Sequence, residues 1–133
     1  MVNQEFYSLI DQICDVDPRY KSDAYEFLME ALAYTQRRYK RYKHVSGEEL
    51  LEGIKQLLMH KFGPLTLLVL NHWGIKSTED FGNIVFNLVD NKILSKDSED
   101  NIDSFQNGYD FNEVFDRGYR KQLEKRISRM RSS

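Results

Sequence analysis

Apolar side chains recur at helical spacing along most of this chain, and that repeat restricts its fold more than any other feature. The first helical stripe lies within residues 3–14 and consists of Phe6, Leu9, Ile10 and Ile13. From Pro18 to about Tyr42 no residue breaks a helix, so the pattern predicts its longest helix there. With only 7 glycines and 2 prolines, the chain lacks the turn-rich composition of an all-β protein. We therefore expect a mainly α-helical protein.

Capping signals divide the rest of the chain into further helices. The segment Ser46-Gly47-Glu48-Glu49 has serine and glutamate at the spacing of a capping box. Gly63-Pro64 ends the helix that this box begins, and Gly74 ends the short apolar helix that follows. The later helices are predicted at 46–62, 65–73 and about 78–91, and from Asn112, the predicted N-cap, onward. With the helices at 3–14 and from Pro18 to about Tyr42, the chain should contain about six helices.

After Lys92 the pattern changes to one short β-hairpin. Two β-prone pieces, Ile93-Leu94 and Ile102–Phe105, flank a polar loop, and Asn107-Gly108 is a turn signal before Tyr109-Asp110-Phe111. Residues 46–111 therefore follow the order of a winged helix-turn-helix: helix, short helix, glycine turn, helix and hairpin. A generic pair of antiparallel helices would produce a similar pattern, and the sequence leaves both interpretations open.

The predicted recognition helix after Gly74 is a poor match to DNA. The side that we expect to face solvent is acidic or neutral and has no lysine or arginine before Lys92; it carries Glu79, Asp80, Asn83, Asn87 and Asp90. Such a surface would be repelled by the phosphates of a duplex. If the core is a winged helix, we expect this face to contact protein or nothing.

A chain of 133 residues is long enough for one domain with a substantial core. We expect a single domain over 1–133, with N-terminal helices in 1–45, a winged-helix-like core in 46–111, and a C-terminal helix with a frayed basic tail in 112–133. No apolar run is long enough to span a membrane, and residues 1–5 lack the features of a signal peptide. The single cysteine, Cys14, fits a reducing compartment, so we expect a cytoplasmic protein.

Charge is segregated along the chain although the formal net charge is only -2. Residues 37–43 carry five cations and no acid, residues 77–116 carry ten acids and two bases, and residues 117–133 carry seven bases and one acid. Blocks of this kind indicate surfaces of opposite sign, or a polar interface with a partner.

The basic run before the capping box is the main candidate site. It interleaves cations with tyrosines and consists of Arg37, Arg38, Tyr39, Lys40, Arg41, Tyr42 and Lys43, with His44 at its end. It could hold phosphates while bases stack on the tyrosines, or pair with an acidic partner. The alternative is an ordinary solvated helix end. Residues 117–131 would extend the patch if the two helices lay side by side, or would neutralise the acidic hairpin instead.

No motif supports catalysis or a cofactor. The three histidines, His44, His60 and His72, lack metal-binding spacing, and Cys14 has no histidine near it in sequence. The acids at 97–103 lack the glycine and terminal glutamate of an EF-hand loop. Phosphate-binding and nucleophile-elbow motifs are missing from the sequence as well. We therefore expect no enzyme activity, no metal and no cofactor.

Several short motifs resemble those of a family of bacterial proteins of unknown function, first described as restricted to Verrucomicrobia and Planctomycetes. They are Asp17-Pro18-Arg19-Tyr20, Ala24-Tyr25 through Ala31-Leu32, Gly47-Glu48-Glu49-Leu50-Leu51, Phe62-Gly63, Trp73-Gly74-Ile75, Asp80-Phe81-Gly82 and Tyr109-Asp110-Phe111. The resemblance covers nearly all of residues 5–119. It implies a bacterial origin and one intact domain, and it brings no activity or site residue.

These observations favour a small binding or adaptor module without catalytic activity, whose charged surfaces contact a protein partner or a second copy. The alternative is a nucleic-acid-binding protein that uses the basic patch at 37–44. We expect no membrane partner.

Overall fold

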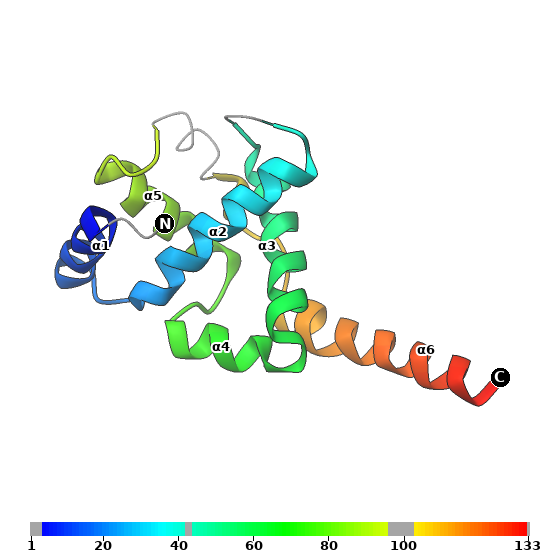
Figure 1. Ribbon diagram of the computed structural model, residues 1–133. Coiled ribbons are helices and arrows are strands. Elements are labelled where there is room, and N and C mark those ends of the chain that lie inside the picture. Colours follow the sequence, from blue (N-terminus) through cyan, green and yellow to red (C-terminus); the bar gives the residue numbers. More distant parts are fainter. Residues whose placement is uncertain (1–3, 42–43, 96–102, 133) are drawn as a thin grey trace.

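The computed structural model describes residues 4–41, 44–95 and 103–132, and most of these residues are helical. The α-helices are α1 (Gln4–Val16), α2 (Ser22–Arg38), α3 (Gly47–Phe62), α4 (Thr66–Trp73), α5 (Thr78–Asp90) and α6 (Gly118–Ser132). A 3-10 turn, η1 (Gly63–Leu65), leads into α4, and a π-helical segment, η3 (Asn112–Arg117), leads into α6. The expected mainly α-helical class is confirmed (Figure 1).

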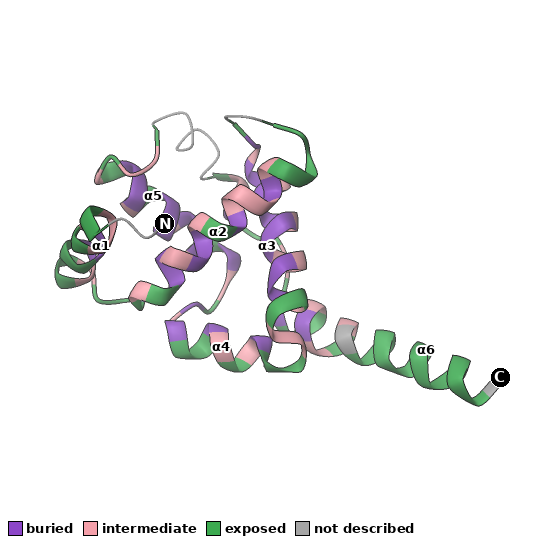
Figure 2. Cartoon of the chain, in the orientation of Figure 1, coloured by how far each residue is buried: buried purple, intermediate pink, exposed green. Residues whose placement is uncertain are grey.

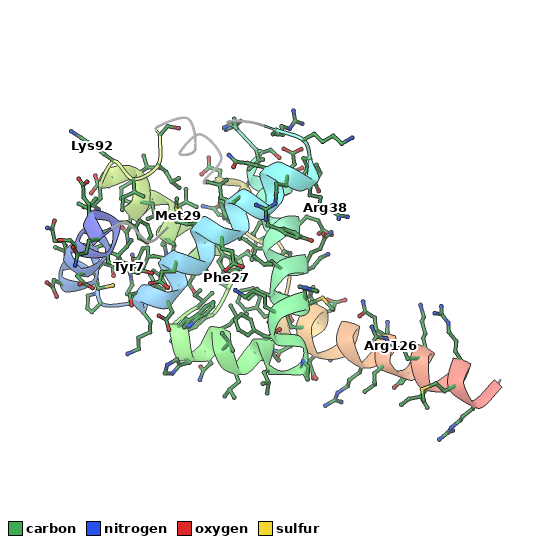
Figure 3. All side chains as sticks on the ribbon, in the orientation of Figure 1. Tyr7, Phe27, Met29, Arg38, Lys92 and Arg126 are labelled. Carbon is green, nitrogen blue, oxygen red and sulfur yellow. The ribbon has the colours of Figure 1, made fainter. Side chains whose placement is uncertain are left out.

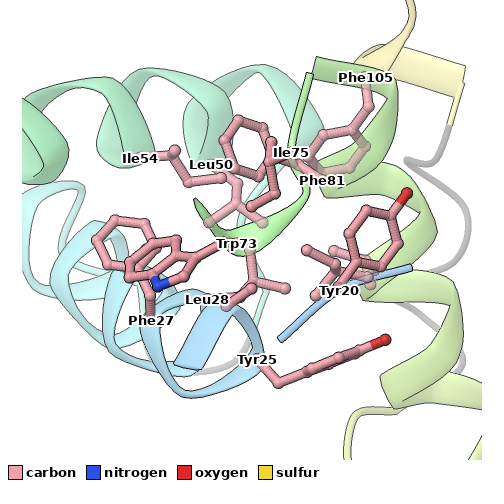
Figure 4. Packing of buried hydrophobic residues seen from close by; sticks show 14 of the residues in the cluster. Tyr20, Tyr25, Phe27, Leu28, Leu50, Ile54, Trp73, Ile75, Phe81 and Phe105 are labelled. Atoms are coloured by element: carbon pink, nitrogen blue, oxygen red, sulfur yellow. The ribbon is translucent and has the colours of Figure 1, made fainter. Parts of the chain in front are cut away.

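The core lies between α2, α3, α4 and α5, with the 103–115 segment closing one side (Figure 4). An aromatic trio joins α2 and α3 to α4: the Trp73 ring lies 5.4 Å from Phe27 and 5.7 Å from Phe62, between centroids. A second aromatic group, formed by Phe81 and Phe111, joins α5 to the C-terminal segment, with centroids 5.8 Å apart. These rings bury large apolar areas and hold elements that are distant in sequence.

The crossing of α2 over α3 is close enough to require a glycine. A Cβ atom on Gly53 would lie 1.9 Å from the hydroxyl oxygen of Thr35. That hydroxyl is buried and donates to the carbonyl oxygen of Ala31 at 2.7 Å, so it cannot turn away without losing its partner. The glycine within α3, which costs helix propensity, is explained by this contact.

The predicted cap at the start of α3 is confirmed. Ser46 accepts from the backbone N–H of Glu49 at 3.0 Å, and the Glu49 carboxylate accepts from the N–H of Ser46 at 2.9 Å. The predicted glycine stops are confirmed too, with φ of 49° at Gly63 and 86° at Gly74, values that favour glycine.

The predicted bounds of α2 are wrong at both ends. It begins at Ser22 rather than Pro18, because Asp17 holds the following residues in a turn by accepting from the backbone N–H of Arg19 at 3.2 Å. It ends at Arg38 rather than near Tyr42, since Lys40 adopts a left-handed φ of 55° and Arg41 N–H donates back to Gln36 at 2.8 Å.

The predicted β-hairpin, and with it the wing, is not formed by the described residues 91–95 and 103–111, which contain no strand. Ile93 and Leu94 instead donate their N–H groups to the carbonyl of Leu88 and close the end of α5. Residues 103–105 form one 3-10 turn that buries Phe105, whose carbonyl accepts from the Thr78 hydroxyl at 2.6 Å. The rest of the predicted hairpin, 96–102, lies outside the described residues.

The final helix differs from the prediction in its start and in its surroundings. Asp110 rather than Asn112 caps it, by accepting from the N–H of Glu113 at 2.9 Å. The π-helical turn η3 buries Phe115 in the core, and α6 then leaves the body of the molecule, exposed from Arg120 to Arg131 (Figures 1 and 2). Within the described residues, no helix is both long and apolar enough to cross a lipid bilayer.

Candidate interaction surface

The basic run lies where α2 ends and the chain turns toward α3. Arg37 and Arg38 occupy the last turn of α2, Tyr39 follows as C-cap, and Lys40 makes the left-handed turn. All four are exposed. Tyr42 and Lys43 lie outside the described residues, so the predicted alternation of cations with tyrosines cannot be followed to its end.

Arg41 is exposed but forms an ion pair with α3. Its guanidinium forms a 3.1 Å ion pair with the carboxylate of Glu49, the residue that also accepts from the Ser46 N–H. These two interactions, the backbone hydrogen bond first, lower the pKa of Glu49. Among the described residues of this run, Arg37, Arg38 and Lys40 are the other exposed cations.

The two basic segments do not form one patch. Arg41 contacts the first turn of α3, whereas Gln122 and Arg126 of α6 line a hollow with Met59 and His60 near its last turn. The 16 residues of α3 span about 24 Å, which separates the segments by more than a Debye length at physiological salt. Figure 3 shows Arg38 and Arg126 at these opposite ends. The condition for extending the patch, that the two helices lie side by side, is therefore not met.

The strongest exposed feature is α6, which continues from η3 without a break. Three large apolar side chains are exposed on it: Leu123 by 43%, Ile127 by 41% and Met130 by 75%. They stand at i, i+4 and i+7 and so share one face of the helix. The remaining positions of α6 include six cations, Arg120, Lys121, Lys125, Arg126, Arg129 and Arg131, and one acid, Glu124. The spacing of these side chains is visible in the sequence, but their exposure is not.

The polar side of α5 is not the open surface that the sequence predicts. Asn83 donates to the Tyr20 hydroxyl at 3.0 Å, and Asn87 donates to Asp17 and to the Tyr25 hydroxyl, both at 2.9 Å. The Tyr20 hydroxyl also donates to Asp80. Because the turn between α1 and α2 covers this side of α5, the helix cannot enter a DNA groove in this conformation.

The hydrogen bonds between residues 17–25 and α5 involve three groups whose pKa values are shifted by their surroundings. Burial raises the pKa of Tyr20 and of Tyr25 to about 12, so both phenols stay protonated and neutral. The guanidinium of Arg19 lies 2.8 and 2.7 Å from the two carboxylate oxygens of Asp17 and holds the pKa of that carboxyl well below its usual range. The Asp17-Pro18-Arg19-Tyr20 motif thus has a structural role: it holds the turn before α2 against α5. We call this set of contacts the clamp.

Replacing Asp17 with asparagine should make stability less sensitive to acid. The depressed pKa means that the carboxylate stabilises the fold fully above about pH 4 and loses this effect as the pH falls below it. We expect a loss of about 1.5 kcal/mol at pH 7 for Asp17→Asn, shrinking toward zero at low pH. Urea unfolding followed by circular dichroism at several pH values measures it. Asp11→Asn, at an exposed position of α1, is the control; parallel pH profiles for both variants would contradict the clamp.

The described residues show no arrangement that points to catalysis or to a metal. No group of three histidine, cysteine or acidic side chains lies close enough to hold an ion within the parts of the chain that the structure describes. Burial raises the pKa of Cys14, whose thiol lies 3.7 Å from the carbonyl oxygen of Tyr20, so it is a weak nucleophile. An open hollow of about 780 Å³ at the end of α5, beside Phe86 and Ile93, is lined without a histidine or cysteine.

Comparison of the chain with protein-family models, with curated proteins and with solved structures finds no match. Its function is therefore inferred from the surfaces of the molecule itself.

Proposed function

We propose that this protein is a non-catalytic binding module that acts through protein–protein contacts, and that α6 is its contact element. The observation that carries this proposal is the exposure of Leu123, Ile127 and Met130 on one face of a helix that leaves the body of the molecule. A marginal helix of 15 residues gains most of its stability from packing, and a partner would supply that packing. Exposed apolar residues gathered on one face are typical of interaction sites.

The alternative is a nucleic-acid-binding protein, supported by the exposed cations Arg37, Arg38 and Lys40 at the end of α2. We rank it second because α5 is engaged within the fold and because phosphate binding does not need the apolar face of α6. The proposed resemblance of residues 46–111 to a winged helix belongs to this nucleic-acid alternative. It now applies only to the helices α3 to α5, without the wing. The bacterial family, the cytoplasmic location and the lack of catalytic activity also remain predictions.

Affinity capture with the full chain as bait tests the proposal. We expect the chain to retain a protein partner after nuclease treatment, and the triple variant Leu123→Ser, Ile127→Ser, Met130→Ser to retain at least about tenfold less of it. The matched control is the double variant Leu65→Ser, Leu68→Ser, which removes exposed apolar side chains near and within α4. Quantitative mass spectrometry of the captured proteins measures the effect.

The outcomes separate the two functions. Equal capture by the α6 variant and the native chain would overturn the role of α6. Loss of all captured material on nuclease treatment would overturn the proposal itself and favour nucleic acid. In that case the double variant Arg38→Glu, Lys40→Glu should abolish binding to labelled oligonucleotides, because both cations are exposed at the end of α2.

A further inference from the structure

The apolar face of α6 is narrow, which restricts what can cover it. At 100° per residue, Leu123, Ile127 and Met130 fall within an arc of about 60°. Their spacings of four and then three residues are those of the d, a and d positions of a heptad repeat. A helix that lies on a core or a lipid surface carries an apolar face of roughly 100° or more, whereas an a/d seam fits one partner helix.

The charges on α6 indicate which charge a partner helix should carry. The helix carries six cations and one acid. Arg126 and Arg131 flank the seam at its g and e positions, and Glu124 occupies the preceding e position. A facing helix packs its own e and g residues beside them, so acidic side chains there would pair with the arginines and basic ones would be repelled. We propose that α6 docks on an acidic amphipathic helix of a partner protein, with Leu123, Ile127 and Met130 as the seam. This inference rests on the proposed function and specifies its partner.

A second copy of this chain fits less well, because each α6 carries six cations and one acid and two such helices repel each other. Two α6 helices paired in parallel would bring Arg126 of one copy beside Arg131 of the other. Two acidic helices lie among the described residues, α1 and α5. Both bury their main apolar side chains in the core of this chain, Ile10 and Ile13 from α1 and Phe81 and Leu88 from α5, and have no seam to offer. The observations therefore favour a different protein as the source of the acidic helix.

Fluorescence anisotropy with the full chain and two synthetic peptides tests the inference. Both peptides have about three heptads with leucine at a and d; one has glutamate at e and g, the other lysine. We expect the glutamate peptide to bind at least about tenfold more tightly than the lysine peptide, and its affinity to fall when the salt rises from about 50 to about 500 mM. Ile127→Ser and Arg126→Glu should each weaken its binding by about tenfold or more, whereas Leu68→Ser, in α4, should not.

Equal affinity for both peptides would overturn the inference. So would an affinity for the glutamate peptide that Ile127→Ser leaves unchanged. Tighter binding to phosphatidylserine vesicles than to the glutamate peptide, with the same dependence on Ile127, would assign α6 to membranes instead. Dimerisation of the free chain that Ile127→Ser abolishes would assign it to a second copy. If affinity capture depends on α6 while neither peptide binds, the partner is not an acidic helix and the proposed function stands. If affinity capture does not depend on α6, both the contact role proposed for α6 and this inference are wrong.

Discussion

Replacing Phe81 with alanine should lower the free energy of unfolding by about 4 kcal/mol. Phe81 is 1% exposed, lies among Leu50, Ile75 and Phe105 in the core, and packs on Phe111 (Figure 4). The loss combines the lost transfer of a phenyl group with the cavity left between helices that cannot fully close around it. Urea unfolding followed by far-ultraviolet circular dichroism measures this change.

Phe86, on the same helix, is the matched control for Phe81. Its side chain is 46% exposed, so Phe86→Ala should cost less than about 1 kcal/mol. Similar losses for the two variants would contradict the orientation of α5, since a rotated helix would bury both rings to a similar degree.

Replacing Gly74 with alanine should cost about 2–5 kcal/mol, through two separate penalties. At φ of 86° an alanine adopts the left-handed conformation, which is strained by about 1–2 kcal/mol. Its Cβ would also lie 2.2 Å from the carbonyl oxygen of Arg19, a backbone atom that moves only if the turn before α2 moves. That overpacking adds about 1–3 kcal/mol. Thermal and urea unfolding both report the loss.

Gly118 provides the control for this substitution. It lies in a helical conformation at the start of α6, and the nearest atom to an added Cβ is 3.5 Å away, an ordinary contact. Gly118→Ala should therefore leave stability unchanged or raise it by up to about 1 kcal/mol, since alanine is the better helix former. A large loss at Gly118, or none at Gly74, would contradict the described backbone at that position.

The elements predicted correctly are those that depend on neighbouring residues. The capping box at Ser46 and Glu49 needs only the spacing of two side chains, and the stops at Gly63 and Gly74 need only a residue that tolerates positive φ. The apolar repeats likewise indicate which face of α1, α2, α3 and α5 is buried. Interactions within a few residues of sequence are visible in the sequence itself.

The errors arise where a distant contact outweighs local preference. Pro18 could begin a helix, but the carboxylate of Asp17 is engaged by Arg19 and by Asn87, a residue seventy positions away. Ile93 and Leu94 have β propensity, but closing the end of α5 uses their N–H groups. Asn83 and Asn87 look solvent-facing on a helical projection, yet Tyr20 and Tyr25 cover them. No local pattern reports such long-range partners.

The sequence by itself determined the mainly helical class, most helix ends, and where along the chain its charges lie. Only the tertiary structure decided which of those charged segments are available to a partner. Arg41 is paired with Glu49, the polar side of α5 is bonded to the segment before α2, and the basic segments lie at opposite ends of α3, while α6 keeps its apolar seam exposed. The physical reason is that availability depends on what packs against a side chain, and that is set by contacts between residues far apart in sequence.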